Sequence, residues 1–143
     1  MKKVLHIEDN SQWRENVRSA LALCLDIELD SVGSLQGFRD KGWPYADLYV
    51  LDRHLPVKEG EHPNDESWKD IVNTVGACYK DSRIIILSRK PPVDTRKYNQ
   101  IVKVFNKSNF DSAVFRTEVE KILGIRLGST VESIAEGYRN GAR

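Results

Sequence analysis

The 143-residue sequence contains no apolar run that approaches the roughly 20 residues a membrane-spanning helix needs. Its first residues, MKKVLHIEDN, reach charged side chains after a short apolar stretch, so they do not form a secretory signal peptide. With 22 Lys and Arg against 21 Asp and Glu, no excess charge favours nucleic acid or an acidic membrane surface. We therefore expect a cytoplasmic protein that binds neither nucleic acid nor membrane.

Cysteine is also scarce, and its two copies do not suggest a disulfide framework. Cys24 and Cys78 each occupy an apolar position of a helical pattern, which favours core packing in a reducing compartment over a disulfide. The composition, 40% hydrophobic and 30% charged, is ordinary for a globular protein, and the length suits one domain.

Segments with strand character alternate with helical segments along the chain. The expected strands are 3–7, 26–32, 48–51, 83–88 and 101–107. The expected helices are 13–24, capped by Asn10 or Ser11; 34–41, ended by Gly42; 68–79; and a closing helix over 115–123. This alternation predicts an α/β fold with a five-stranded parallel sheet and helices on both faces.

Two segments fit the alternation poorly. Residues 89–100 have weak helical periodicity, and their two prolines limit any helix there to about two turns. The tail, 124–143, is poor in apolar residues, so we expect it to be flexible or partly helical after a domain over 1–123.

Polar side chains follow four of the predicted strands. Glu8 and Asp9 end the first, Asp52 the third, Ser88 the fourth and Lys107 the fifth. Parallel strands end at one edge of a sheet, where open α/β folds bind ligands. Clustered carboxylates repel unless a cation lies among them, and oxygen ligands suit Mg²⁺. A lysine and a hydroxyl nearby would bind a phosphoryl group, so the pattern indicates phosphate chemistry at Asp52.

The motifs VLHIEDN, LYVLDRHLP, IIILS and VFNKS give the chain a family resemblance. Over residues 2 to 123 it resembles the receiver domain of two-component response regulators. That resemblance implies a flavodoxin-like, doubly wound sheet with strand order 2-1-3-4-5.

The resemblance also implies a role for each site residue. Asp52 would accept a phosphoryl group from a histidine kinase or a histidine phosphotransfer protein, with Mg²⁺ as the cofactor. Asp9 would bind the metal directly, Glu8 through water, and the backbone carbonyl of His54 would add a ligand. Ser88 would donate to the phosphoryl group and Lys107 would pair with it. Such a protein is its own substrate rather than a turnover enzyme, and it signals through a downstream protein partner.

Several positions depart from the family pattern. The interval from Asp52 to Ser88 is long, and the excess falls in the polar loop 57–66. Val104 stands where an aromatic residue is usual, Ser108 follows the lysine in place of proline, and Arg89 replaces a small residue. The phosphorylation site thus looks intact while the usual output surface does not.

Two alternatives remain open at this point. One is a receiver-like interaction module that signals without phosphorylation, which the altered output positions favour. The other is an aspartate-nucleophile phosphohydrolase of the haloacid-dehalogenase type. That class has a second Asp two residues after the nucleophile, where this chain has His54, and it usually carries a cap domain. The tail is too short for a helix-turn-helix unit, so we expect a stand-alone receiver.

Overall fold

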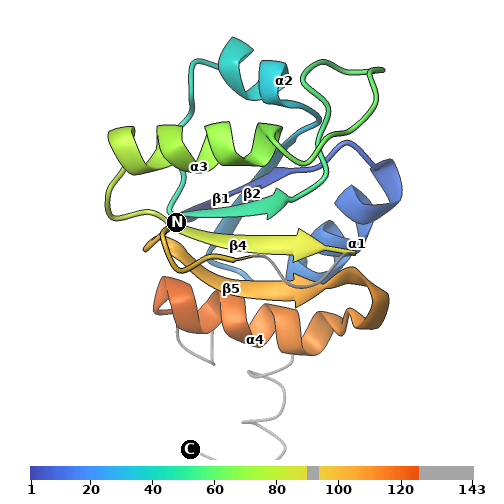
Figure 1. The fold of residues 1–143 in the computed structure, drawn as a ribbon. Coiled ribbons are helices and arrows are strands. Elements are labelled where there is room, and N and C mark those ends of the chain that lie inside the picture. Colours follow the sequence, from blue (N-terminus) through green and yellow to red (C-terminus); the bar gives the residue numbers. More distant parts are fainter. Residues whose placement is uncertain (90–93, 126–143) are drawn as a thin grey trace, which may run out of the picture.

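A computed structural model describes residues 1–89 and 94–125 (Figure 1). The strands are β1 (Lys2–Ile7), β2 (Ile27–Val32), β3 (Leu48–Asp52), β4 (Arg83–Ser88) and β5 (Ile101–Asn106). The helices are α1 (Ser11–Leu21), α2 (Leu35–Asp40), α3 (Ser67–Cys78), the short 3-10 helix η1 (Lys107–Asn109) and α4 (Ser112–Leu123). The predicted tail lies outside the described residues from position 126 onward.

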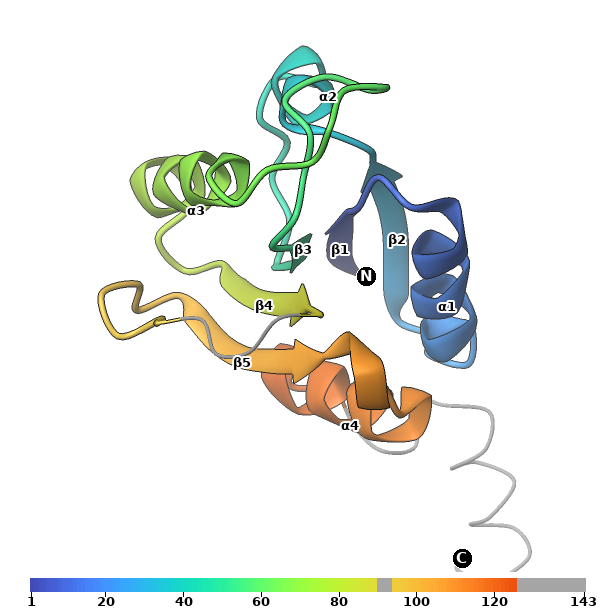
Figure 2. The same cartoon turned by 45° about the vertical axis from the view of Figure 1, so that its right-hand side comes forward.

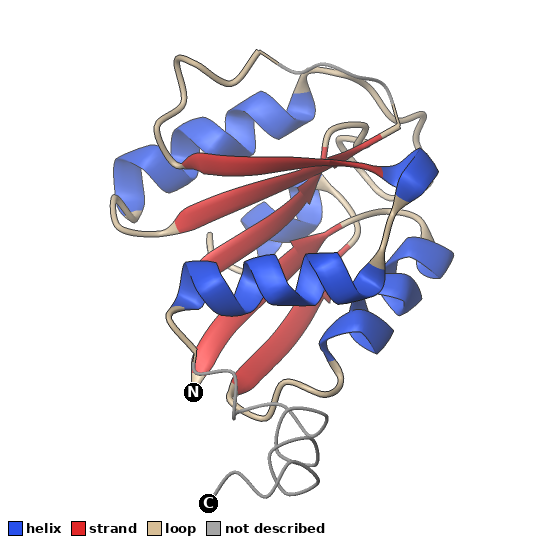
Figure 3. Ribbon diagram, turned by 90° about the horizontal axis from the view of Figure 1, so that it is seen from below, coloured by secondary structure: helices blue, strands red, loops and turns tan. Residues whose placement is uncertain are grey.

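The five strands form one parallel sheet in the order β2-β1-β3-β4-β5, which confirms the predicted flavodoxin-like topology. Helices α2 and α3 cover one face of this sheet, and α1 and α4 cover the other (Figures 2 and 3). β3 is buried along its whole length because it lies in the middle of the sheet between these two helical layers. The apolar run that leads into Asp52 is therefore a central strand.

Local signals fix where α1 begins and ends. The Asn10 side chain accepts a hydrogen bond from the Trp13 backbone N–H at 3.0 Å, which makes Asn10 the N-cap, one of the two predicted caps. The helix ends at Leu21, earlier than expected, because the chain turns there toward β2. Cys24 lies in that turn and is still buried, so its predicted core position is correct although its predicted helix is not.

Cys78 is exposed, so its predicted place in the core is wrong. It is the last residue of α3, and the helical stripe that packs on the sheet ends before it, at Val75. The next side chain, Tyr79, packs against the core instead and donates its hydroxyl to the Trp43 carbonyl at 2.6 Å. At the end of a helix, a periodic pattern of apolar residues does not show which of two neighbouring side chains points into the core.

The connection between β4 and β5 contains no helix among its described residues, 94–100, so the short helix considered for this segment is absent from that part. Turns take its place there. Gln100 holds the segment to the sheet by donating to the carbonyls of Tyr79, at 2.8 Å, and Ser82, at 2.9 Å. β5 ends one residue earlier than predicted, at Asn106, so Lys107 begins η1.

The long loop 53–66 is anchored at both ends. Leu55 and Asn64 form an isolated antiparallel bridge, and the Pro56 carbonyl accepts the Leu35 N–H at the start of α2. The Asn64 side chain accepts from the Ser67 N–H at 2.8 Å, at the start of α3. Within the described residues, no helix is long and apolar enough to cross a bilayer.

Candidate functional site

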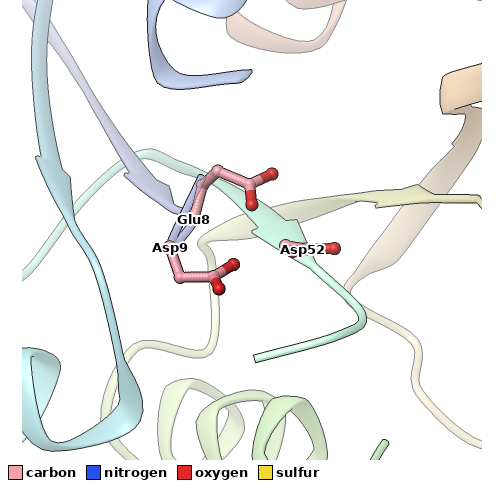
Figure 4. Close-up of side chains that lie close together, drawn as sticks. All are labelled: Glu8, Asp9 and Asp52. Carbon is pink, nitrogen blue, oxygen red and sulfur yellow. The ribbon is translucent and has the colours of Figure 1, made fainter. Parts of the chain in front are cut away.

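Three carboxylates meet at the carboxyl edge of the sheet. β1 pairs with β3 in parallel register, Ile7 opposite Leu51, so the residues that follow them end side by side. Glu8, Asp9 and Asp52 each offer an oxygen within 4.8 Å of the others (Figure 4). Glu8 and Asp52 are buried, whereas Asp9 is more accessible. The structure thus brings together the three acidic residues that the sequence singled out.

Lys107, which directly follows the edge strand β5, completes this cluster. Its Nζ lies 2.7 Å from Glu8 Oε1 and 3.2 Å from Asp52 Oδ1. The Lys107 side chain is only 5% exposed, so these contacts lie out of water. The Asn106 side chain accepts from the Ser108 N–H at 2.8 Å and fixes the turn that presents the lysine. The predicted phosphoryl-binding cation therefore lies next to the predicted acceptor.

The charges of the buried cluster are unbalanced without a further cation. Burial raises the pKa of Glu8 to about 8, and so do the hydrogen bond that the protonated Glu8 carboxyl donates to Asp52 and repulsion by the Asp52 carboxylate, although Lys107 acts the other way. One ammonium group cannot neutralise two buried carboxylates, so Glu8 keeps a proton at neutral pH. A hard divalent cation could replace that proton. The donor set, three carboxylates at one edge, is the kind that binds Mg²⁺ together with water and phosphate oxygens.

His6 lies beneath the site on the same strand and carries no charge there. Burial, with repulsion by Lys107 and Arg14, lowers the pKa of His6 to about 3. Both ring nitrogens are buried without a hydrogen-bond partner. The imidazole is thus neutral at physiological pH and adds no positive charge below the carboxylates.

The turn after β1 is held by side chains that the sequence did not single out. The Arg14 guanidinium donates to the Glu8 carbonyl at 2.8 Å and to the Asp9 carbonyl at 3.0 Å. The Asn10 N–H donates to Glu8 Oε2 at 3.2 Å. These bonds fix the backbone of the acidic pair. Arg14 was missed because it reads as an ordinary exposed residue of a helix.

An open cavity of about 290 Å³ lies over the cluster. Ser88, Arg89 and His54, all named from the sequence, line it together with the carboxylates and Lys107. Ser88 is the last residue of β4, the neighbour of β3 in the sheet, and both Ser88 and Asp52 line this cavity. A small anionic group bound here would contact a hydroxyl, an ammonium group and the acidic cluster at once.

His54 contacts the site through its backbone and the long loop through its ring. Its N–H donates to Asp52 Oδ1 at 3.1 Å, so the main chain runs beside the predicted acceptor. Its Nδ1 lies 2.7 Å from Asp65 Oδ1, across the hairpin closed by Leu55 and Asn64. Asp65 was missed because no local pattern shows which residues of a long loop face each other.

Trp13 also lines the cavity, with the Lys107 Nζ 5.0 Å from the centre of its ring. In the sequence it reads as the first core residue of α1. Its position four residues after Asp9 was the only available hint that it faces the site, since a helix starting at the acidic pair must pass over that edge.

No protein-family model matches this sequence, and it has no match among curated proteins. Solved structures, in contrast, are similar over most of the chain. The beryllofluoride-activated receiver domain of DrrB, a Thermotoga maritima protein, has a TM-score of 0.69 at 14% identity, covering 87% of this chain and 98% of its own. The chain has the receiver-domain fold.

Two further receivers give the same result. TrrA from Thermotoga maritima, in complex with Mg²⁺ and beryllofluoride, has a TM-score of 0.63 at 21% identity and covers 85% of this chain and 99% of its own. The chemotaxis regulator CheY4 of Vibrio cholerae has a TM-score of 0.65 at 18% identity, with coverages of 85% and 98%. At these identities the likeness concerns the receiver fold, so the function rests on the residues of the site.

Proposed function

We propose that this chain is a phosphorelay switch, which accepts a phosphoryl group on Asp52 and passes the signal to a protein partner. The observation that carries the proposal is the contact of the Lys107 ammonium, at 3.2 Å, with the Asp52 carboxylate inside an acidic cluster. Carboxylate nucleophile, neutralising cation and metal-type ligands are the groups that phosphoryl transfer needs.

The chemistry follows from these groups. Asp52 attacks the phosphorus of a phosphohistidine on a histidine kinase or a histidine phosphotransfer protein, while the bond to the imidazole nitrogen breaks. Lys107 neutralises charge on the equatorial oxygens, and the Ser88 hydroxyl donates to one of them. Water later hydrolyses the acyl phosphate and restores the carboxylate. The protein thus catalyses only its own phosphorylation and dephosphorylation.

Asp9 and Asp52 would hold Mg²⁺ directly, Glu8 through water, and the His54 carbonyl would add a ligand. When bound, the ion supplies positive charge that offsets the anionic donor. The excess negative charge of the buried carboxylates supports this assignment, because Glu8 otherwise keeps a proton. The binding of metal should therefore release protons, and it should tighten as pH rises toward 8.

The test is mass spectrometry after incubation with acetyl phosphate and Mg²⁺. We expect one phosphate per chain, on Asp52, that requires the metal and is lost in Asp52→Asn. Asp9→Asn should weaken Mg²⁺ binding by at least about tenfold, measured by calorimetry. Asp70→Asn, which removes an exposed carboxylate on α3, is the matched control and should change neither result. Phosphate on His54 or on a serine instead of Asp52 would disprove the assignment.

A second candidate function, an interaction module that does not use phosphorylation, is favoured by one observation. Val104, at the position where receivers usually carry an aromatic residue, is 36% exposed on β5 and has no ring to change position. If Asp52 takes up no phosphate from acetyl phosphate or from a phosphorylated histidine protein while Mg²⁺ still binds, this second function is the better one.

A further inference from the structure

We propose that Trp13 is a positioning residue for Lys107, its indole ring holding the ammonium group over the acceptor carboxylate. The inference rests on the proposed function, since it assigns a residue to the same reaction. It starts from one juxtaposition: the Lys107 Nζ lies 5.0 Å from the centre of the Trp13 ring, in the cavity that also contains Asp52.

Both the backbone and the ring of Trp13 are held in place. Trp13 lies in the first turn of α1, where its backbone N–H donates to the capping Asn10 at 3.0 Å. Its ring also packs edge-on against Phe110, with ring centres 5.3 Å apart. Phe110 directly follows η1, the short helix that carries Lys107, and it packs in turn on Phe115 of α4. The ring therefore joins the acidic turn after β1 to the segment that presents the lysine.

The contact between the Lys107 ammonium and the Trp13 ring is a cation–π interaction. A cation over an indole face is attracted by the ring quadrupole, more so when the cation is out of water; Lys107 is 5% exposed, whereas Trp13 is partly buried. Of the three N–H donors of the ammonium group, one donates to Glu8 Oε1 at 2.7 Å, and Asp52 Oδ1 lies 3.2 Å away as an ion-pair partner. The indole is the uncharged neighbour among these contacts. The contact between the indole and the ammonium group persists when Glu8 and Asp52 bind a metal ion or a phosphoryl group instead of Lys107.

The Lys107 ammonium needs a contact that positions it, because the side chain has a flexible stem of four carbons. The turn of η1 fixes its backbone through the hydrogen bond from the Ser108 N–H to Asn106, but that bond does not orient the ammonium group. If the carboxylates were its only anchors, binding of a cation or a phosphoryl group there would release it. The ring limits its motion to the edge of the cavity.

A purely structural role for Trp13, packing α1 against α4, makes a different prediction. Loss of packing would slow phosphorylation by the same factor whether or not Lys107 is present. Positioning of Lys107 requires that the effect of Trp13 disappear once the ammonium group is removed.

The experiment is a double-mutant cycle on the rate at which acetyl phosphate and Mg²⁺ label Asp52. Trp13→Leu should slow labelling about tenfold, and Trp13→Phe, which keeps an aromatic face, less than about threefold. In Lys107→Met, the added Trp13→Leu change should alter the rate less than about twofold. Trp43→Leu, at the opposite edge of the sheet, controls for loss of a tryptophan and should label as wild type.

A spectroscopic readout separates this inference from the proposed function. With Trp43→Phe and Trp68→Phe in place, the emission of Trp13 should change when Lys107→Met removes the ammonium group, and again when Mg²⁺ and beryllofluoride bind. Fluorinated tryptophans at Trp13 keep its shape and weaken the ring quadrupole, so labelling should slow stepwise with fluorine content even if Trp13→Leu does not fold.

The outcomes are distinct. If wild type takes no phosphate on Asp52, the proposed function fails, and the emission of Trp13 with and without Lys107 still tests the contact. If wild type is labelled but Trp13→Leu matches it, slows both backgrounds equally, or leaves emission insensitive to Lys107, the positioning role is wrong.

Discussion

β4 and β5 are neighbouring strands with opposite surroundings. They pair in parallel, with Ile86 of β4 opposite Val104 of β5, yet Ile86 is fully buried and Val104 is 36% exposed. β4 lies inside the sheet, between helices on both faces. β5 is an edge strand, and the described part of the connection before it forms no helix to cover it. Two residues that lie opposite each other on paired strands therefore contribute very differently to the stability of the fold.

The comparison explains where the site lies. Glu8 follows β1, while Asp52 and Ser88 are the last residues of β3 and β4, and the carboxyl halves of these three strands are buried. Lys107 alone comes from the exposed side of the sheet, and η1, Asn106 and the contact with Trp13 hold it. Rigid strands thus position the acidic groups, whereas local contacts position the cation.

The largest expected effect is on stability. Ile86→Ala should lower the free energy of unfolding by about 2–5 kcal/mol, because it leaves a cavity in the core. Val104→Ala, one strand away on the same rung, should change it by no more than about 0.5 kcal/mol. Urea unfolding of both variants at constant slope measures the difference. Similar losses in the two would mean that β5 is covered in solution and that the contrast does not hold.

The same contrast explains how much of the fold the sequence could predict. Continuous apolar runs such as RIIILS identify buried strands with little ambiguity, and the start of α1 falls at one of the two predicted caps, Asn10. The parallel direction of the strands then follows from their alternation with helices, whereas the strand order was implied by the family resemblance. Residues 89–100 carry no such signal, so the absence of a helix over 94–100 could only be seen in the structure.

The site divides in the same way. The grouping of Glu8, Asp9, Asp52 and Lys107 could be predicted, because strand ends in a parallel sheet meet at one edge. The contact of His54 with Asp65 could not, since it depends on the register of a loop hairpin. Nor could the role of Trp13, because an aromatic residue at a helical core spacing has the same pattern whether it faces the core or a cavity.

The second prediction concerns how the free energy of unfolding depends on pH, which two buried groups, Glu8 and His6, control. The pKa of Glu8 rises from 4.5 to about 8 on folding, so between these two pH values the folded state binds more protons and loses stability as pH rises. The pKa of His6 falls from 6.5 to about 3, so the folded state loses stability as pH falls below 6.5. Between pH 4.5 and 6.5 the two effects oppose each other. We therefore expect a plateau there in metal-free protein, with declines on both sides.

From pH 6.5 to 8 the decline should reach about 1–2 kcal/mol, since one pKa unit corresponds to about 1.4 kcal/mol. Urea unfolding across the pH series measures it. Glu8→Gln should remove the alkaline decline, whereas Asp94→Asn, which changes an exposed acid paired with Arg96 in the β4–β5 connection, should leave it unchanged. An alkaline decline that persists in Glu8→Gln would assign it to another group.

The smallest expected effect concerns Arg89, the residue at which the buried strand passes into the exposed connection. Arg89 is exposed, follows Ser88 and lines the cavity over Asp52. Its guanidinium can pair with a phosphoryl group on Asp52 and restrict the approach of water, so Arg89→Ala should speed hydrolysis of the acyl phosphate about threefold, or less than 1 kcal/mol in barrier. Decay of the labelled protein after removal of acetyl phosphate gives the rate. Arg89→Lys, which keeps the charge without the planar fork, should fall between wild type and Arg89→Ala. Equal decay in all three proteins would mean that Arg89 points to solvent. The exposed connection to β5 would then begin directly after Ser88, without a contribution to the site.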